Sequence, residues 1–285
     1  MQNQPSPSFL GLLLISLVIS LFSCQSAHQQ LGSTQAGEAR TGFIVEEASQ
    51  ANPQLEDYLN FGRNVYDGII HLQNNSRRGK NYVSGETWQT HSPKLDAMIN
   101  YSDQACDYEV RFGPHELSCV EGYNQLALGF YERETLIETI YGETSQLLIT
   151  TAQGEVDLDA EIYVPAAIEF HTPQPSYEEL EVGTNITWEP DPNFTAGMIL
   201  MLDYLPSTAS AEIESSHPDR ISYAKVIPDD GSYTFSEAEL SYFQTGMPVR
   251  MYLIRGKYMV FRGEVTNASL AFAGYTMIKH NFQMK

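Results

Sequence analysis

The sequence predicts an all-β protein with two β-sandwich domains, which follow an apolar leader and a flexible tether. Its 17 Tyr and 13 Phe lie largely in short runs with β-branched residues, and such side chains fit a pleated sheet. Glycine, proline, asparagine and aspartate separate the runs, which is typical of strands joined by turns. A proline-containing stretch between residues 164 and 183 divides the runs into two groups, and this division indicates two domains.

The leader is an apolar segment from Phe9 to Phe22, interrupted only by Ser16 and Ser20. A helix that crosses a bilayer needs about 20 residues, whereas the apolar part of a secretory signal has about 7 to 15. The length of the segment therefore favours a signal peptide over residues 1–23. An uncleaved membrane anchor is the other interpretation.

The apolar segment ends in the letters LFSC, with the cysteine at position 24. This ending resembles the lipobox of bacterial lipoproteins, although residues 1–23 contain no Lys or Arg, which such signals normally carry. The resemblance implies that Cys24 receives a diacylglyceryl group, that a peptidase cleaves before it, and that its new amino group is acylated. Gln25 resembles the residue that directs lipoproteins to the outer membrane of Gram-negative bacteria. We therefore expect a lipid-anchored protein of the cell envelope.

Residues 24–42 are expected to form a flexible tether. They are rich in Gln, Ser and Gly and have no periodic apolar residues. Such a segment cannot bury enough apolar surface to offset the entropy lost on ordering. The folded part should therefore stand away from the membrane.

The N-terminal domain is expected to span residues 43–170. Eight short runs of strand character at close spacing favour a sandwich or a barrel-like sheet, and a short helix is possible at 54–61. The expected strands are NVYDGIIHL, KNYVSGETW, DAMINY, CDYEVRF, ELSCVEG, LALGFY, LIETIY and SQLLITT.

The C-terminal domain is expected to span residues 171–285. Prolines at 165, 173 and 175 precede or begin it, and proline cannot donate to a strand ladder, so a sheet should not run through this joint. Ser236 to Glu239 fits a capping box and predicts one helical turn. Seven strands are expected: NITW, GMILMLDYL, RISYAKVI, GSYTF, PVRMYLIRG, KYMVFRG and LAFAGYTMIKHNF.

Three pieces of this half, ITWEPDPN, PDDGSYTFSEAEL and VRMYLIRG, resemble the immunoglobulin-like C-terminal domains of lipoproteins from the Bacteroidota. The likeness covers about the last 110 residues, in keeping with the seven strands of such a sandwich. Trp188 is present, but this half has no cysteine, so the antibody-type bridge is absent. The resemblance implies a fold and a cellular address, and it implies no activity.

Two cysteines remain besides Cys24, and they are Cys106 and Cys119. In an exported protein an even pair is most simply a disulfide. Gly113 and Pro114 lie between them and predict a turn, so the flanking runs could form a hairpin that brings the sulfurs together. Reactive free thiols and buried reduced cysteines are the alternatives.

The chain is strongly acidic, with 36 Asp and Glu against 16 Lys and Arg, a net charge of −20. This balance argues against nucleic acid as a partner, because phosphate binding requires clustered cations. The charge is uneven, since residues 247–285 contain six basic side chains and only one acidic side chain, Glu264. Either the last strands lie beside acidic ones and are neutralised, or they form a basic binding face.

The segment EVDLDAEIYV places carboxylates at alternate positions, from Glu155 through Asp157 and Asp159 to Glu161. On a regular strand all four would project from one face. They could contribute to a calcium site if a loop supplied further oxygens, because Ca²⁺ takes six to eight ligands. The other interpretation is an edge strand whose acidic face is solvated and resists aggregation. Calcium is the one cofactor that the sequence suggests.

The common enzyme signatures GxSxG, HExxH, CxxC and the phosphate loop are absent from the sequence. We therefore expect a non-enzymatic binding or scaffolding module, held to the membrane by its lipid, with an unknown protein or glycan partner. A carbohydrate-binding accessory lipoprotein is the first alternative, since Trp88 and Tyr82 could stack on sugars. An unrecognised hydrolase is the second alternative.

Overall fold

The computed structural model describes residues 42–45, 66–80, 84, 86–99, 106–120, 125–127, 135–172, 178–217 and 219–285. The expected signal peptide, Cys24, nearly all of the tether and the expected helix at 54–61 lie outside these residues. In the described part strands predominate strongly over helices, which confirms that the structure is mostly β. No helix in this part is both long and apolar enough to cross a membrane.

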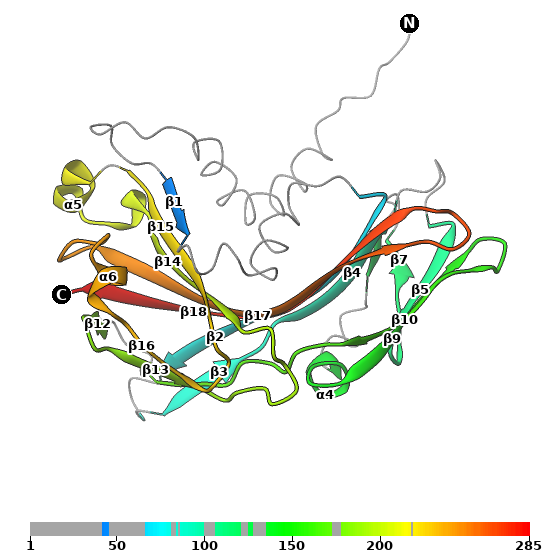
Figure 1. Cartoon of the computed structure of the whole chain (residues 1–285), viewed down its shortest axis with the longest axis horizontal. Helices are drawn as coiled ribbons and strands as arrows, with labels where there is room; N and C mark the ends of the chain where they lie inside the picture. The colour runs from blue at the N-terminus through cyan, green and yellow to red at the C-terminus, as the bar shows by residue number, and fades with distance from the viewer. Residues whose placement is uncertain are drawn as a thin grey trace, which may run out of the picture.

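An eleven-stranded sheet forms the main layer of the structure (Figure 1). Its order is β1-β15-β14-β17-β18-β2-β4-β8-β7, with β12 also paired to β18 and β3 to β2. The pairs β1–β15, β18–β2 and β12–β18 are parallel, and the other pairs are antiparallel. The strands are β1 (Gly42–Val45), β2 (Gly68–Lys80), β3 (Thr87–Thr90), β4 (Pro93–Ile99), β7 (Ser118–Cys119), β8 (Gln125–Ala127), β12 (Glu178–Leu180), β14 (Met198–Tyr204), β15 (Ile221–Ile227), β17 (Pro248–Arg262) and β18 (Ser269–Met284).

The hairpin of β17 and β18 is the longest feature of this sheet and curves through the structure in Figure 1. The two strands pair without interruption from Pro248 and Gln283 to Arg262 and Ser269. At roughly 3.4 Å per residue, a strand of this length spans about 50 Å. The sequence predicts two strands, PVRMYLIRG and KYMVFRG, where the structure has only β17. Gly256 lies inside this strand, and a larger residue would not fit there, because a Cβ would come within 2.8 Å of the Cβ of Tyr275.

The first hydrophobic core lies between one end of the long hairpin and a four-stranded sheet of order β10-β9-β5-β6. Leu270 and Phe272 of β18 contribute to this core, together with Ile70 and Leu72 of β2. The elements of the smaller sheet are β5 (Tyr108–Phe112), β6 (His115–Glu116), β9 (Thr144–Thr151) and β10 (Val156–Tyr163), and the short helix α4 (Leu136–Thr139) lies before β9.

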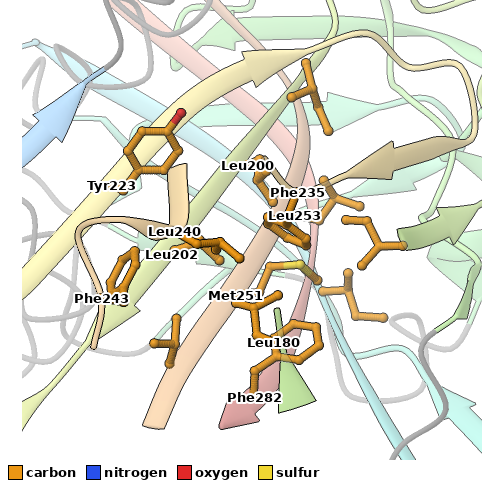
Figure 2. Close-up of a cluster of buried hydrophobic side chains, with 14 of the residues drawn as sticks. Leu180, Leu200, Leu202, Tyr223, Phe235, Leu240, Phe243, Met251, Leu253 and Phe282 are labelled. Atoms are coloured by element: carbon orange, nitrogen blue, oxygen red, sulfur yellow. The ribbon is translucent and has the colours of Figure 1, made fainter. Parts of the chain in front are cut away.

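The second hydrophobic core lies between the other end of the hairpin and a three-stranded sheet of order β11-β13-β16. Figure 2 shows side chains of the large sheet, among them Leu200, Met251 and Leu253, gathered with Phe235 and Leu240. The Ser236–Glu239 capping box is confirmed at the start of α6. The remaining elements are β11 (Phe170–Thr172), β13 (Asn185–Trp188), β16 (Ser232–Thr234), η3 (Pro206–Thr208), α5 (Ala211–Ser216) and α6 (Glu237–Leu240).

The segment LIETIY was predicted as a strand, and this prediction is wrong. It forms α4 and the turn after it. Leu136 and Ile140 are both fully buried in the first core, and their spacing of four places them on one side of a helical turn. The β-branched composition suggested a strand, but the spacing of the buried residues follows the helical period.

The expected boundary between residues 170 and 171 does not separate two sheets. β2 and β4 come from the predicted N-terminal domain, yet they pair in one sheet with β14, β15, β17 and β18. A core lies on each side of the boundary, but β18 contributes to both cores. Residues 164–169 form no strand, and the chain crosses between the cores there without breaking the large sheet. The proline-containing stretch 164–183 is not free of strands, however, since β11 and β12 lie within it.

Candidate functional site

The large sheet has one face that is not part of the two main cores, and we call it the second face. On β18, Leu270, Phe272, Ile278 and Phe282 point into the cores. Because successive side chains of a strand alternate, odd-numbered β18 residues such as Tyr275 lie on the second face. Residues opposite them on neighbouring strands share this face. It therefore collects side chains from both halves of the sequence.

One end of the second face holds a balanced set of charges. His71 and Asp96 are cross-strand partners on β2 and β4, with Nδ1 and Oδ1 3.8 Å apart. Lys94 Nζ lies 3.2 Å from the other oxygen of Asp96. Burial lowers the pKa of His71, although Asp96 opposes this effect. The Tyr275 hydroxyl donates to the side-chain oxygen of Gln73 at 2.9 Å. The acidic group at this end therefore has a basic residue, Lys94, beside it.

The other end of the second face holds three cations, Arg77, Arg250 and Lys279, which we call the cationic patch. Lys279 pairs with Tyr252, and its Nζ lies 5.6 Å from the centre of that ring. Partial burial lowers the pKa of Lys279, and the charges of Arg250 and Arg77 lower it further. In the described part of the chain no carboxylate forms an ion pair with any of the three.

Asp203 lies opposite Arg250 in the sheet but is already engaged. Its oxygens accept from the guanidinium of Arg220 at 2.8 and 2.9 Å and from the hydroxyl of Ser222 at 2.5 Å. Arg250 instead donates through Nε to the amide oxygen of Asn281 at 3.1 Å. The charge of Asp203 is therefore balanced by Arg220, and the guanidinium of Arg250 keeps donors for a ligand.

A cavity of about 260 Å³ opens beside Arg250 at the end of the large sheet. Ligand pockets that enclose a whole drug-sized molecule measure about 300 to 1,000 Å³, so this one suits only a part of a larger ligand. Its lining combines apolar residues, among them Leu205, Val249 and Phe282, with hydroxyl, amide and charged groups. The polar residues around it are Asp203, Thr208, Ser210, Arg250, Asn281 and Gln283.

Trp88, predicted as a sugar-stacking residue, lies on β3 with 49% of its surface exposed. It pairs with Gly79, two residues after Arg77 on β2, so it shares the second face with the cationic patch. Tyr82, the other predicted ligand-binding residue, lies outside the described residues. Exposure of a large aromatic ring beside a cationic patch makes Trp88 available for contact.

A serine, a histidine and a glutamate meet on the core side of the sheet. Ser76 Oγ lies 2.8 Å from Nδ1 of His91, whose Nε2 lies 3.0 Å from Glu169. Asn74 also donates to Nδ1 of His91, at 2.9 Å. Ser76 is only 1% exposed, so a substrate could reach it only if its neighbours moved. The group ties β2 to the segment before β11, and the hydrolase hypothesis stays a prediction.

A buried ion pair fixes the crossing segment between the cores. Arg255 Nε lies 2.8 Å from Asp229, and both side chains are almost completely buried. The guanidinium also donates to the carbonyls of Ala166 and Glu189, at 2.9 and 2.7 Å. The indole of Trp188 donates to Asp229 at 2.7 Å. This network holds the predicted joint, β13 and β17 in one arrangement.

The predicted row of four carboxylates on one face is wrong for β10. The register shifts between Val156 and Leu158, and Asp157 is buried while Asp159 and Glu161 are exposed. Asp157 accepts from the amides of Val265 and Thr266 and from the hydroxyl of Thr266, at 2.7 to 2.9 Å. Its carboxylate therefore holds the β17–β18 loop, because the bulge turns it away from its neighbours.

The calcium hypothesis loses Asp157 as a free ligand for this reason. Asp159 accepts from the amide of Gln146 at 2.7 Å, and Glu161 is exposed on the same strand. Among the described residues no three His, Cys, Asp or Glu side chains are arranged to hold a metal ion. Calcium binding through the exposed acidic residues stays a prediction.

Cys106 and Cys119 form a disulfide, with Cα atoms 5.8 Å apart. The predicted turn at Gly113 and Pro114 is confirmed, and it joins β5 to β6. Cys106 precedes β5 of the smaller sheet, whereas Cys119 lies in β7 of the large sheet. The bridge therefore links the two sheets that enclose the first core.

Comparisons with known proteins identify no relative, since no family model and no curated protein matches this chain.

Proposed function

We propose that this chain is a non-enzymatic, lipid-anchored protein of the cell envelope that acts as a binding or scaffolding module. The Cys106–Cys119 disulfide carries the proposal, because disulfides persist in oxidising compartments outside the cytoplasm. The leader and the LFSC ending at Cys24 supply the matching route of export and the anchor. The outer membrane of a Gram-negative bacterium is the proposed location, since Gln25 follows the acylated position.

A scaffolding role is supported by the continuity of the structure. The long β17–β18 hairpin joins both cores, and the Arg255–Asp229 network fixes the crossing segment beside it. We regard each core as the centre of a β-sandwich domain, the C-terminal one immunoglobulin-like. In this proposal residues 43–170 and 171–285 keep one relative orientation, so a partner would meet a preformed surface.

Mass spectrometry of the protein purified from membranes tests the anchor. The expected product begins at Cys24 and carries a diacylglyceryl group and an amide-linked acyl chain, because two or more chains are needed for durable anchoring. Cys24→Ala should move the protein from the membrane fraction to the soluble fraction. An intact Met1, or an unmodified thiol at position 24, contradicts the proposal.

A carbohydrate-binding accessory lipoprotein is the second candidate, and exposed Trp88 favours it. An aromatic ring offers its flat face to the apolar side of a sugar. Pull-down with insoluble polysaccharides should then capture the wild type and lose Trp88→Ala. The matched control is Tyr242→Ala, an exposed aromatic on a different part of the chain. Equal retention of the wild type and Trp88→Ala removes Trp88 from this function.

A further inference from the structure

We propose that the cationic patch and the cavity beside Arg250 form a binding site for a carboxylate-bearing polysaccharide. This inference rests on the proposed binding function and names its ligand class. Arg77, Arg250 and Lys279 contact the carboxylates, and the cavity accepts one sugar unit of the chain. None of the three cations is used by the structural networks that hold the cores together.

Charge complementarity is the first argument. In a chain with a net charge of −20, the patch brings together three cations that no carboxylate of the described part pairs with, and Arg250 and Arg77 both act on the charge of Lys279. Two other basic residues of this part of the chain are paired with carboxylates, Arg255 with Asp229 and Lys285 with Glu179. The cations of the patch repel one another, and that repulsion is relieved when an anion binds.

The order of the strands is the second argument. Arg250 lies on β17, and Lys279 lies on the adjacent strand β18. Arg77 lies on β2, directly after Ser76, the last residue of β2 that pairs with β18. Trp88 follows on β3, beside Gly79. Neighbouring strands are about 4.8 Å apart, so these groups form a line across the sheet of roughly 14 Å from β17 to β3. A line of this kind fits an extended chain better than a compact ion.

The lining of the cavity is the third argument, and it favours a glycan over an acidic polypeptide. Hydroxyls of Thr208 and Ser210 and the amide of Gln283 surround the space next to Arg250. Hydroxyl and amide groups both donate and accept hydrogen bonds, as the hydroxyls of a sugar require. The guanidinium of Arg250, oriented by Asn281, presents paired donors that match a carboxylate.

Binding of the full lipidated protein in detergent to three immobilised polymers tests this inference. The probes are polygalacturonate, which carries carboxylates, dextran, which is neutral, and polyglutamate, which carries carboxylates on a peptide. We expect binding to polygalacturonate that weakens with salt, and weaker or no binding to the other two. Exposed ion contacts are individually weak, so the triple variant Arg77→Gln/Arg250→Gln/Lys279→Gln should lose about tenfold or more in affinity.

The matched control is Lys257→Gln/Arg262→Gln/Lys285→Gln, which removes the same number of positive charges, two from β17 and one from the residue after β18. It should keep wild-type affinity, and both triple variants should keep the wild-type melting temperature. Equal losses in the two triple variants, or equal binding of polyglutamate, overturn the site.

The outcomes separate this inference from the proposed function. Binding to dextran that is lost in Trp88→Ala overturns the carboxylate site and leaves a neutral glycan-binding function. Absence of binding to all three polymers, in a protein whose Cys24 is acylated, overturns the ligand class and leaves the envelope proposal standing. An unmodified Cys24 contradicts the envelope proposal whatever the polymers show.

Discussion

The guanidinium of Arg255 lies 2.8 Å from the carboxylate of Asp229, and the two side chains are only 1% and 2% exposed. Removal of one partner of a buried pair leaves an uncompensated charge, which costs about 3 to 5 kcal/mol. Arg255→Met and Asp229→Asn should each lower the free energy of unfolding by about this amount, measured by urea denaturation.

The exposed pair of Arg111 and Glu116, 3.5 Å apart, is the control for this measurement. Exposed pairs contribute about 0 to 1 kcal/mol, so Arg111→Gln should change stability little. A loss below about 1 kcal/mol in both buried-pair variants would contradict the structural role of the network.

The disulfide should stabilise the first core. It closes a loop between positions 13 apart, for which chain entropy predicts about 3 kcal/mol. Cys106→Ser/Cys119→Ser should therefore unfold at lower urea concentration than the oxidised wild type. The oxidised protein, denatured without reductant, should show no labelling at these two cysteines, and full labelling of both would exclude the bridge in the cell.

Asp157 should stabilise the loop of the long hairpin. Hydrogen bonds to a charged group contribute about 1.5 to 3 kcal/mol, and this buried carboxylate accepts several from residues 265 and 266. Asp157→Asn should lower the melting temperature with or without Ca²⁺, whereas Asp159→Asn on the exposed side should not. A rise in melting temperature on adding Ca²⁺ that is lost in Asp159→Asn would support the calcium hypothesis. An unchanged melting temperature in Asp157→Asn would show that the loop does not depend on the Asp157 carboxylate.

His280 should make stability fall with acidity. Burial lowers its pKa to about 4, and Arg78 contributes to the shift. Between about pH 6.5 and 4 the unfolded chain binds a proton that the folded chain does not, so stability is present above the unfolded pKa and lost as pH falls. The loss is about 3 kcal/mol at most.

The variant His280→Gln tests this dependence. Its free energy of unfolding should fall less steeply than that of the wild type between pH 6.5 and 4, and the remaining slope includes His71, whose pKa burial also lowers. Urea midpoints measured across this range provide the comparison. Parallel profiles for the two proteins would show that His280 titrates normally in the fold.

Part of the fold follows from local patterns. The Ser236–Glu239 box predicts α6 because the capping hydrogen bonds form within four residues. Gly113 and Pro114 predict their turn for the same reason. LIETIY is predicted wrongly, because its β-branched residues favour a strand while the burial of Leu136 and Ile140 favours a helical turn. Local preference was weaker than packing against the first core.

The candidate site depends more on distant pairing. The sequence shows the excess of basic residues in 247–285. It leaves open whether acidic strands neutralise these residues or whether they form a basic binding face. The structure shows both outcomes, since Arg255 is neutralised while Arg250 and Lys279 are not. Arg77 gives no signal in the sequence, because its place beside Lys279 depends on the parallel pairing of β2 with β18, 202 positions apart.

The sequence by itself determined the strand-rich class, the turn at Gly113 and Pro114, the capped helix and the acidic charge, and it favoured the pairing of the two cysteines. These features depend on composition or on residues close together in the chain, so they can be predicted from the sequence alone. The tertiary structure decided that one sheet serves both cores, that Asp157 turns inward, and which cations remain unpaired. Such outcomes depend on which strands become neighbours, and that choice is made by packing over the whole chain.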